Sequence, residues 1–281
     1  MNYRNLIKIG TSILRDNAIS SANLDAELLL SISLKRSREK ILLNLEQKSK
    51  FSEFKNYLKL INKRKNRVPV SLISKKRFFW KGEFFVNNNV LTPRFETEIL
   101  IEEVLKECAR HENINILDIG VGSGCIIISL LKEKSSWRGT ALDVSSLALN
   151  VARINAKMQQ IDNRIKFINS DIDKLNSNKY DLIISNPPYI NKIEYNNLDL
   201  GVKNFEPKTA LYGGIDGLKI IEKIVKRSKF VLKLKGLLAL EIGLGQYYQV
   251  KNLLEMNGFF VSKVIKDYQN IIRCLIAIKI K

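Results

Sequence analysis

Apolar residues recur at helical spacing through the first 70 residues of the chain, and no stretch there alternates strictly between apolar and polar positions. The runs lie at 6–14, 24–32, 38–45 and 51–61. Each run predicts an amphipathic helix, and no proline before Pro69 interrupts the pattern. We therefore expect residues 1–70 to form a small all-α domain whose apolar faces pack inward.

The pattern then changes to one that is typical of short strands. Residues 78–86 combine several aromatic side chains with a central glycine, and three asparagines follow. Such a run predicts a β-hairpin, and we place a connecting hairpin at 71–95. A helix is expected to follow and to end near Cys108, with Thr92 or Thr97 as its N-cap.

Strand-like and helix-like runs alternate through the rest of the chain. Strands are predicted at 115–119, 140–144, 164–170, 180–185, 237–241, 259–267 and 272–280, and helices at 125–133, 146–157, 218–232 and 246–256. Repeated strand–helix units predict an α/β domain over 96–281, with a mostly parallel sheet between two layers of helices. Only a few residues join the last two strands, so these must be antiparallel neighbours. We expect a seven-stranded sheet with an antiparallel edge strand.

A glycine-rich turn follows the first predicted strand of this domain. Residues 118–124 read Asp-Ile-Gly-Val-Gly-Ser-Gly. Glycines at the turn from a strand into a helix permit a tight bend and let a ligand approach the backbone closely. The spacing is Gly-x-Gly-x-Gly, which differs from the dinucleotide pattern Gly-x-Gly-x-x-Gly because position 125 is cysteine. By itself the turn does not establish a nucleoside cofactor.

Acidic residues end the next two predicted strands. Asp143 lies roughly 20 residues beyond the glycines, where a carboxylate can accept hydrogen bonds from both hydroxyls of a ribose. Asp171 follows the third strand and could accept from the exocyclic amine of an adenine. Either aspartate could instead cap the helix that follows it. Three successive strands nevertheless end in polar groups at one edge of the sheet, where open α/β sheets bind ligands.

The fourth strand ends in Asn186-Pro187-Pro188-Tyr189. Neither proline can donate a hydrogen bond to a sheet, and Pro187 biases Asn186 towards an extended conformation. We expect a rigid strand end that holds an amide and a phenol ring in a fixed relation, next to the cofactor. This arrangement suits a planar –NH2 group, but it does not distinguish a glutamine amide from an adenine amine. Tyr189 could also be an ordinary core residue.

Composition narrows the class of protein. Hydrophobic residues make up 45% of the 281 residues, which is a globular composition. No apolar run approaches the ~20 residues of a membrane span, and no signal-peptide core opens the chain, so we expect a cytoplasmic protein without a membrane partner. The three cysteines lack metal-ligand spacing, and the one histidine, His111, lies in a polar stretch. We therefore expect no metal, no zinc-hydrolase chemistry and no Ser–His–Asp chemistry.

The positive charge is concentrated near the N-terminus. The chain has 47 Lys and Arg against 28 Asp and Glu, and residues 1–75 hold 16 of the former and 6 of the latter. Such a charge could steer the protein towards nucleic acid, a ribosome or an acidic protein. It could equally reflect a composition in which Lys, Asn and Ile are abundant everywhere.

Taken together, these motifs resemble the S-adenosylmethionine-dependent amino-methyltransferases of the Rossmann-like class. The glycine-rich turn and Asn-Pro-Pro-Tyr are shared by adenine methyltransferases of DNA and RNA and by protein glutamine methyltransferases. The helical N-terminal domain and the segments 92–98 and 206–218 are similar to those of the PrmC/HemK family. Phe95 stands where that family usually has proline, and Lys75 where it often has glycine; both lie outside the two core motifs.

The resemblance implies N5-methylation of the glutamine in the Gly-Gly-Gln motif of class I peptide-chain release factors. S-adenosylmethionine is the implied cofactor, residues 1–70 would recognise the substrate, and a monomer that does not require nucleic acid is expected. Two alternatives are an N6-adenine methyltransferase of DNA or RNA, which the charge favours, and a ribosomal-protein glutamine methyltransferase. A third is a non-catalytic cofactor-binding module that docks on ribosomes.

The same resemblance assigns the site residues by position. Cofactor contacts fall on Gly120, Val121, Gly122, Ser123, Gly124, Asp143, Asp171 and Asn186. The substrate glutamine would lie against Asn186, Pro187, Pro188 and Tyr189. Catalysis would rest on Asn186, Pro187 and Tyr189: the Asn186 side-chain oxygen and the Pro187 carbonyl would accept both amide N–H groups, and Tyr189 would stack on the amide plane.

Overall fold

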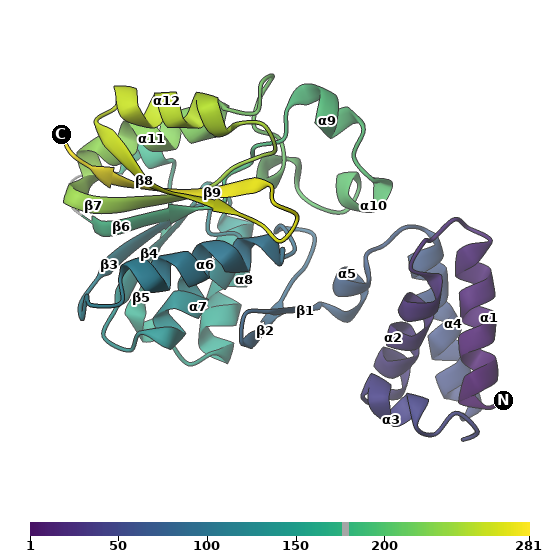
Figure 1. The fold of residues 1–281 in the computed structure, drawn as a ribbon. Helices are drawn as coiled ribbons and strands as arrows, with labels where there is room; N and C mark the ends of the chain where they lie inside the picture. The colour runs from purple at the N-terminus through teal and green to yellow at the C-terminus, as the bar shows by residue number, and fades with distance from the viewer. Residues whose placement is uncertain (176–179) are drawn as a thin grey trace. The chain divides into compact units, whose positions relative to one another are not determined.

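A computed structural model of the chain describes residues 1–175 and 180–281. The chain divides into two compact units (Figure 1). The N-terminal unit comprises residues 1–75 and 199–205, and the sheet unit comprises 76–198 and 206–281. The domain boundaries expected at residues 70 and 95 stay predictions. Each unit is described by itself below.

The N-terminal unit is helical, as its apolar pattern predicts. Its helices are α1 (Tyr3–Arg15), α2 (Ala22–Leu34), α3 (Arg38–Leu42), α4 (Phe51–Lys65), α5 (Val70–Ser74) and α10 (Leu200–Lys203). The apolar faces of α1 to α5 enclose one core, in which Tyr3, Leu30 and Tyr57 are buried. α4 runs beyond the end predicted at residue 61, and Arg64 in this extension pairs with the buried Asp25 of α2 at 2.7 Å.

A hairpin of β1 (Lys76–Phe79) and β2 (Gly82–Phe85) begins the sheet unit. Phe79 and Phe84 are buried in the core of this unit with their rings edge to face, 6.0 Å apart. The Phe85 backbone N–H donates to Asn155 Oδ1 at 2.7 Å, which anchors the hairpin to α8 (Ser146–Met158). Core packing therefore accounts for the rings of Phe79 and Phe84, whereas Phe78 is exposed.

The sheet unit is built on seven strands. They are β3 (Asn115–Ile119), β4 (Arg138–Asp143), β5 (Ile165–Asn169), β6 (Tyr180–Ser185), β7 (Leu232–Glu241), β8 (Phe259–Lys266) and β9 (Ile272–Lys279). Their order across the sheet is β5-β4-β3-β6-β7-β9-β8. β3 to β7 pair in parallel, and β9 runs antiparallel to both its neighbours. The predicted α/β class with a mostly parallel sheet is confirmed.

One detail of the predicted sheet is wrong. The antiparallel strand β9 lies between β7 and β8, so the edge strand is β8 and not the antiparallel one. A short connection shows that two strands are antiparallel neighbours but not which of them lies further inside. Burial in the structure shows the difference: Cys274 to Ala277 in β9 are consecutively buried, whereas Phe259 is the one buried residue of β8.

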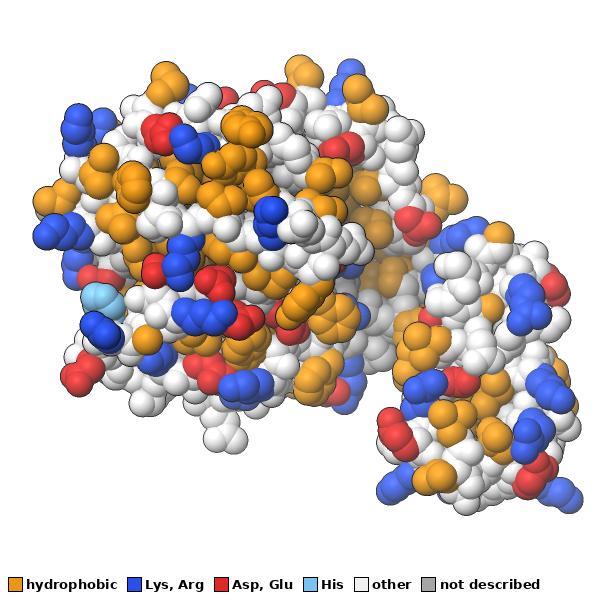
Figure 2. All heavy atoms as spheres, in the orientation of Figure 1, with side chains coloured by type: hydrophobic (Ala, Val, Ile, Leu, Met, Phe, Trp, Pro, Cys, Tyr) orange, Lys and Arg blue, Asp and Glu red, His pale blue; other side chains and the backbone are white. Residues whose placement is uncertain are grey.

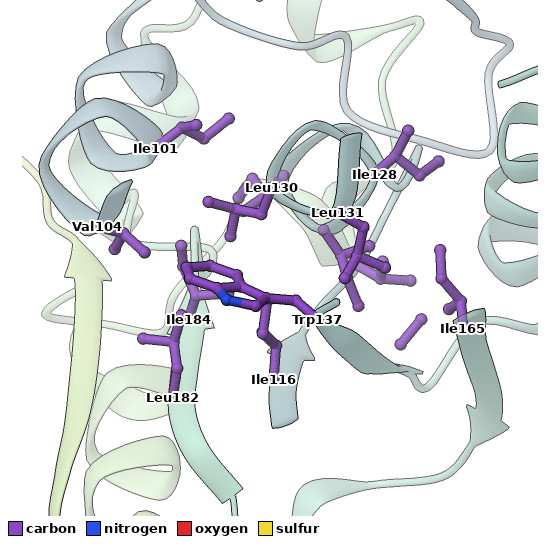
Figure 3. Packing of buried hydrophobic residues seen from close by; sticks show 14 of the residues in the cluster. Ile101, Val104, Ile116, Ile128, Leu130, Leu131, Trp137, Ile165, Leu182 and Ile184 are labelled. Carbon is purple, nitrogen blue, oxygen red and sulfur yellow. The ribbon is translucent and has the colours of Figure 1, made fainter. Parts of the chain in front are cut away.

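Helices cover both faces of the sheet (Figure 1). α6 (Glu96–Glu107), α7 (Cys125–Glu133) and α8 pack on one face, and α11 (Lys219–Val231) and α12 (Tyr247–Met256) pack on the other. Alternate residues of one strand serve the two cores: Ile184 belongs to the first and Ile183 to the second. Figure 3 shows Trp137 among the residues of the first core. Its indole N–H donates to the His111 carbonyl at 3.2 Å.

One local prediction around α6 needs correction. Neither Thr92 nor Thr97 caps α6: Phe95 occupies the N-cap position, and no side chain caps the helix. After β6 the chain forms α9 (Lys192–Asn196), α10 and the short helix η3 (Lys208–Ala210). Asp199 explains α10, since its side chain accepts from the Gly201 backbone N–H at 2.7 Å and so caps the turn.

Replacement of Gly124 is expected to destabilise the sheet unit. Gly124 has φ +82°, and a Cβ there would lie 2.8 Å from Ile128 Cδ1 and 3.3 Å from Ala152 Cβ. Gly124→Ala combines a left-handed backbone with overpacking, so we expect the free energy of unfolding to fall by about 2–4 kcal/mol. Urea unfolding measures the change.

Gly245→Ala is the matched control, because Gly245 has φ +80° but open space around a Cβ. It should cost only the backbone term of about 1–2 kcal/mol. Equal losses in the two variants would contradict the packing role of Gly124.

Candidate functional site

A cavity of about 180 Å³ lies in the sheet unit at the carboxyl ends of the parallel strands. The chain builds outward from β3 to β4 and β5 on one side, and β6 pairs on the other side of β3. This is the topological switch point at which open α/β sheets bind ligands. Of the predicted site residues, the cavity is lined by Gly120, Val121, Gly122, Ser123, Asp143, Asp171, Asn186 and Pro188.

The other three predicted residues, Gly124, Pro187 and Tyr189, lie outside the lining. Gly124 begins α7 and allows α7 and α8 to approach each other, as described above. Pro187 is buried directly behind Asn186, and Tyr189 is half-buried against the second core. Pro187 and Tyr189 can therefore help to position Asn186, whereas Gly124 acts through packing.

The glycine-rich turn presents open backbone to the cavity. Gly120 and Gly122 have φ of +72° and +53°, and a Cβ on Gly120 would meet no atom within 4 Å. The backbone N–H groups of Gly120 and Val121 donate to the Leu142 carbonyl at 2.9 and 3.1 Å, which holds the turn against the end of β4. The space left beside Gly120 is what a ligand needs to approach the backbone.

Asp143 is held rigidly at the end of β4. Its Oδ2 accepts from the Gly122 backbone N–H at 3.0 Å, and its Oδ1 accepts from the Ser145 N–H at 2.9 Å. Burial raises the pKa of Asp143, although these backbone N–H groups oppose the shift. Each carboxylate oxygen has a second lone-pair site, so both can still accept from a pair of hydroxyl groups.

Asp171 lies at the end of β5 with a basic partner. Its Oδ2 accepts from Lys223 Nζ at 2.5 Å, and its Oδ1 accepts from the Asp173 backbone N–H at 3.1 Å. Burial alone would raise the pKa of Asp171, but the bond from Lys223 and the Asp173 N–H together lower it. Asp171 caps the short helix η2 (Ile172–Lys174) and also lines the cavity, so the same side chain has both roles.

Asn186 belongs to a chain of buried hydrogen bonds. Its Nδ2 donates to Thr97 Oγ1 at 3.0 Å, and Thr97 Oγ1 donates to Glu241 Oε2 at 2.6 Å. The Tyr189 hydroxyl donates to the other oxygen, Glu241 Oε1, at 3.2 Å. Only 1% of Glu241 is exposed. Burial raises the pKa of its carboxyl to about 7, although the hydrogen bonds from Thr97 and Tyr189 lower it.

Thr97 and Glu241 were not identified as site residues from the sequence. Thr97 was considered only as a helix cap, and Glu241 only as the last residue of a strand. A usable signal was nevertheless present, because Glu241 is a charged residue that ends the apolar run 237–240. The structure pairs Ser185 with Leu240, which places Glu241 level with Asn186.

The segments 92–98 and 206–218 meet beside the cavity. Arg94 pairs with the buried Glu206 at 2.7 Å, and Arg94 and Pro207 both line the cavity. The Ile190 backbone N–H donates to the Leu211 carbonyl at 3.0 Å, which ties the second segment to the strand end at Asn-Pro-Pro-Tyr. Two stretches that are far apart in the sequence thus close the same side of the site.

These residues fit a nucleoside cofactor. Apolar side chains of Leu142, Ile172 and Ile224 line the cavity together with the glycine-rich turn, Asp143 and Lys223. A planar base can lie against such apolar walls, and its polar edge and ribose then meet charged groups at the rim. The open space beside Gly120 leaves room for the rest of the molecule.

Other kinds of chemistry find little support. Cys125 also lines the cavity, but burial raises the pKa of its thiol to about 12, so it is not a reactive thiolate at neutral pH. In residues 1–175 and 180–281, no cluster of His, Cys, Asp and Glu could hold a metal ion. Within the same ranges, no helix combines the length and apolarity of a membrane span.

Comparisons with known proteins agree with this geometry. The family model described as PrmC N-terminal domain matches residues 5–74, and that described as Methyltransferase small domain matches residues 95–201. The solved structure of a methyltransferase from Pyrococcus furiosus is 19% identical with a TM-score of 0.53, covering 70% of this chain and 89% of that one. That likeness shows a shared fold.

Curated relatives match nearly the whole chain. The release factor glutamine methyltransferase of Caulobacter vibrioides is 36% identical over 267 residues, which is 95% of this chain and 92% of that protein. The protein of the same name from Clostridium acetobutylicum is 36% identical over 258 residues, 91% of this chain and 90% of its own length.

The fold and the matched catalytic domain define a Rossmann-like methyltransferase, which uses S-adenosylmethionine as cofactor, as predicted from the sequence. Within that class, the chain belongs to the family of release factor glutamine methyltransferases. The resemblance to the PrmC/HemK family that the sequence motifs indicated is thereby confirmed.

Proposed function

We propose that this chain methylates N5 of the glutamine side chain in the Gly-Gly-Gln motif of class I release factors. The observation that carries the proposal is the position of Asn186. It lies at the rigid end of β6 and lines the cavity that also holds Asp143 and the glycine-rich turn. A methyl donor and a planar amide can therefore be held side by side. The names of the curated relatives support this substrate.

The chain's own residues would act by positioning. An amide nitrogen is a poor nucleophile because its lone pair is delocalised into the carbonyl group. Acceptance of both N–H groups, by Asn186 Oδ1 and the Pro187 carbonyl, favours a pyramidal nitrogen with its lone pair directed at the methyl group. S-adenosylmethionine supplies that methyl group as a reactive sulfonium. Positioning of this kind can contribute up to about 7–11 kcal/mol.

No strong base is needed before the transfer, because the nitrogen becomes more acidic as it gains the methyl group. The nitrogen would then release one N–H proton to solvent, and S-adenosylhomocysteine would leave as a neutral thioether. This agrees with the hydrogen-bond chain from Asn186, in which the carboxylate of Glu241 already accepts from two hydroxyl groups. Tyr189, whose hydroxyl is fixed by Glu241, would flank the substrate amide and limit its rotation. Local geometry would thus replace acid–base catalysis.

A parallel assay tests the choice of substrate. Labelled S-adenosylmethionine is offered with a class I release factor, ribosomal proteins, DNA and RNA under identical conditions. Label in the release factor alone is expected. Label in DNA or RNA would instead support the adenine methyltransferase, and label in a ribosomal protein would support the related glutamine methyltransferase.

No continuous basic surface favours the nucleic-acid alternative on the face shown in Figure 2. There, Lys and Arg side chains lie interspersed with Asp and Glu over both units. We include in the proposal that the enzyme works as a monomer in the cytoplasm and does not require nucleic acid.

The proposal assigns substrate recognition to residues 1–70. Lys55 and Lys59 are exposed on successive turns of α4, in the unit that holds most of the excess charge. Reversal of both charges, Lys55→Glu with Lys59→Glu, should raise KM for intact release factor about 3- to 10-fold through loss of electrostatic attraction. The kcat on a short Gly-Gly-Gln peptide should stay unchanged. Steady-state kinetics on the two substrates measure both effects.

The matched control is Lys157→Glu with Lys166→Glu, two exposed positions in the sheet unit. If this control raised KM for the release factor as much as the α4 variant does, the assignment of recognition to residues 1–70 would be wrong.

A further inference from the structure

The Asn186 amide can face the cavity in two ways that differ in chemistry. With its oxygen towards the cavity, it accepts from a substrate N–H; with its nitrogen there, it would donate, and a substrate –NH2 group would find no acceptor. The two orientations have nearly the same shape, so packing alone does not choose between them. Methyl transfer to an amide nitrogen requires the first.

The buried hydrogen-bond chain makes this choice. In its ionised form the Glu241 carboxylate can only accept, and its Oε2 then takes the single hydroxyl hydrogen of Thr97 at 2.6 Å. Thr97 Oγ1 then has only lone pairs to offer to Asn186. The group facing it must be a donor, which is Nδ2, at 3.0 Å. Asn186 Oδ1 is left for the cavity, and within residues 1–175 and 180–281 it accepts no hydrogen bond from the protein.

We propose that Glu241 and Thr97 are positioning residues, which fix the orientation of the Asn186 amide so that its oxygen faces the substrate. This inference rests on the proposed function, since it explains how Asn186 comes to accept from the glutamine nitrogen. Glu241 acts through Thr97, Thr97 acts through Asn186, and neither needs to touch the reacting atoms.

The same carboxylate also holds the phenol ring of Tyr189, which lies outside the cavity lining. Glu241 Oε1 accepts from the Tyr189 hydroxyl at 3.2 Å, so one buried group sets both the amide and the phenol ring of Asn-Pro-Pro-Tyr. A buried carboxylate is costly unless hydrogen bonds stabilise it. An apolar residue at the end of β7 would avoid that cost, which is consistent with selection of Glu241 for the orientation it imposes.

A pair of substitutions at Thr97 tests the inference. Thr97→Val keeps the shape of the side chain but removes the hydroxyl, and Thr97→Ser keeps the hydroxyl. We expect kcat for release-factor methylation to fall about 10–100-fold in Thr97→Val and to stay within about threefold of wild type in Thr97→Ser. The Kd for S-adenosylmethionine, measured by calorimetry, should not change in either variant. Wild-type kcat in Thr97→Val, or equal losses in both variants, would overturn the inference.

A measurement on the wild-type protein does not depend on whether Thr97→Val folds. Nuclear magnetic resonance can follow exchange of the Asn186 side-chain NH2 protons with water, assigned from their loss in Asn186→Ala. The hydrogen bond to Thr97 should slow this exchange relative to the side-chain NH2 of Asn150, an exposed residue of α8. Exchange as fast as that of Asn150 would refute the fixed orientation.

Failure of the proposed function gives a different result. In that case the wild-type enzyme would not methylate a release factor at all, although the Asn186 NH2 protons could still exchange slowly. An active wild type with a freely exchanging Asn186 amide would leave the proposed function standing and overturn only the orientation by Glu241 and Thr97.

Discussion

Asn186→Ala is expected to lower kcat for release-factor methylation by about a hundred- to a thousandfold, the loss that follows removal of one preorganised hydrogen-bonding group at a reacting centre. The variant removes the oxygen that would accept from the glutamine N–H and leaves Thr97 without its donor. The backbone of β6 and both prolines stay in place, so the cavity keeps its shape. Single-turnover kinetics with saturating cofactor measure the chemical step directly.

The Kd for S-adenosylmethionine should change little in this variant, because the residues of the glycine-rich turn and Asp143 form a separate part of the cavity lining. Asn150→Ala, at an exposed position of α8, is the matched control and should behave as wild type. Near-normal turnover in Asn186→Ala would show that the amide does not take part in the transfer.

Asp143→Ala is expected to weaken cofactor binding about a hundredfold or more. Hydrogen bonds to a charged acceptor contribute about 1.5–3 kcal/mol each, and two ribose hydroxyls would lose theirs. The variant also leaves the N–H groups of Gly122 and Ser145 without the acceptors that fix the turn. Calorimetric titration with S-adenosylmethionine measures the change in Kd.

Asp162→Ala serves as the control for this variant, because Asp162 is an exposed aspartate at the start of the short helix η1 (Asp162–Arg164). Its Kd should equal that of the wild type. An unchanged affinity in Asp143→Ala would refute the ribose role of this carboxylate, whatever happened to turnover.

Most of the fold could be predicted because the signals for it are local. β3, α7 and β6 begin and end at the residues predicted from periodicity and from flanking Gly and Pro. Parallel strands point their carboxyl ends to one edge, so prediction of the strands already placed Gly120, Asp143 and Asn186 at a common site. Local pattern and strand direction together were sufficient to bring these three residues to one cavity.

The rest depends on which elements become neighbours, and local patterns do not contain that information. Thr97 and Glu241 are 144 positions apart in the chain, yet their side chains are 2.6 Å apart. Their contact requires α6, which carries Thr97, to pack against β7, which ends at Glu241. The position of β9 was itself predicted wrongly, because a hairpin signal does not say which of its strands lies inside the sheet.

The sequence also does not predict which residues of a motif face the ligand and which pack against the protein. The three glycines of the turn look equivalent there, but Gly120 and Gly122 line the cavity, whereas Gly124 makes room for Ile128 and Ala152. Likewise, Asp171 was expected to meet an adenine amine, and the structure shows that it also binds Lys223. Only three-dimensional contacts separate a packing role from a ligand role.

The most direct test of the account is the site of methylation in the product. A class I release factor is incubated with the enzyme and S-adenosylmethionine, digested, and analysed by tandem mass spectrometry. The account predicts one added methyl group on the side-chain nitrogen of the glutamine in Gly-Gly-Gln, and none with Asn186→Ala. A methyl group on another residue, or an unmodified release factor beside methylated adenine in added DNA or RNA, would contradict it.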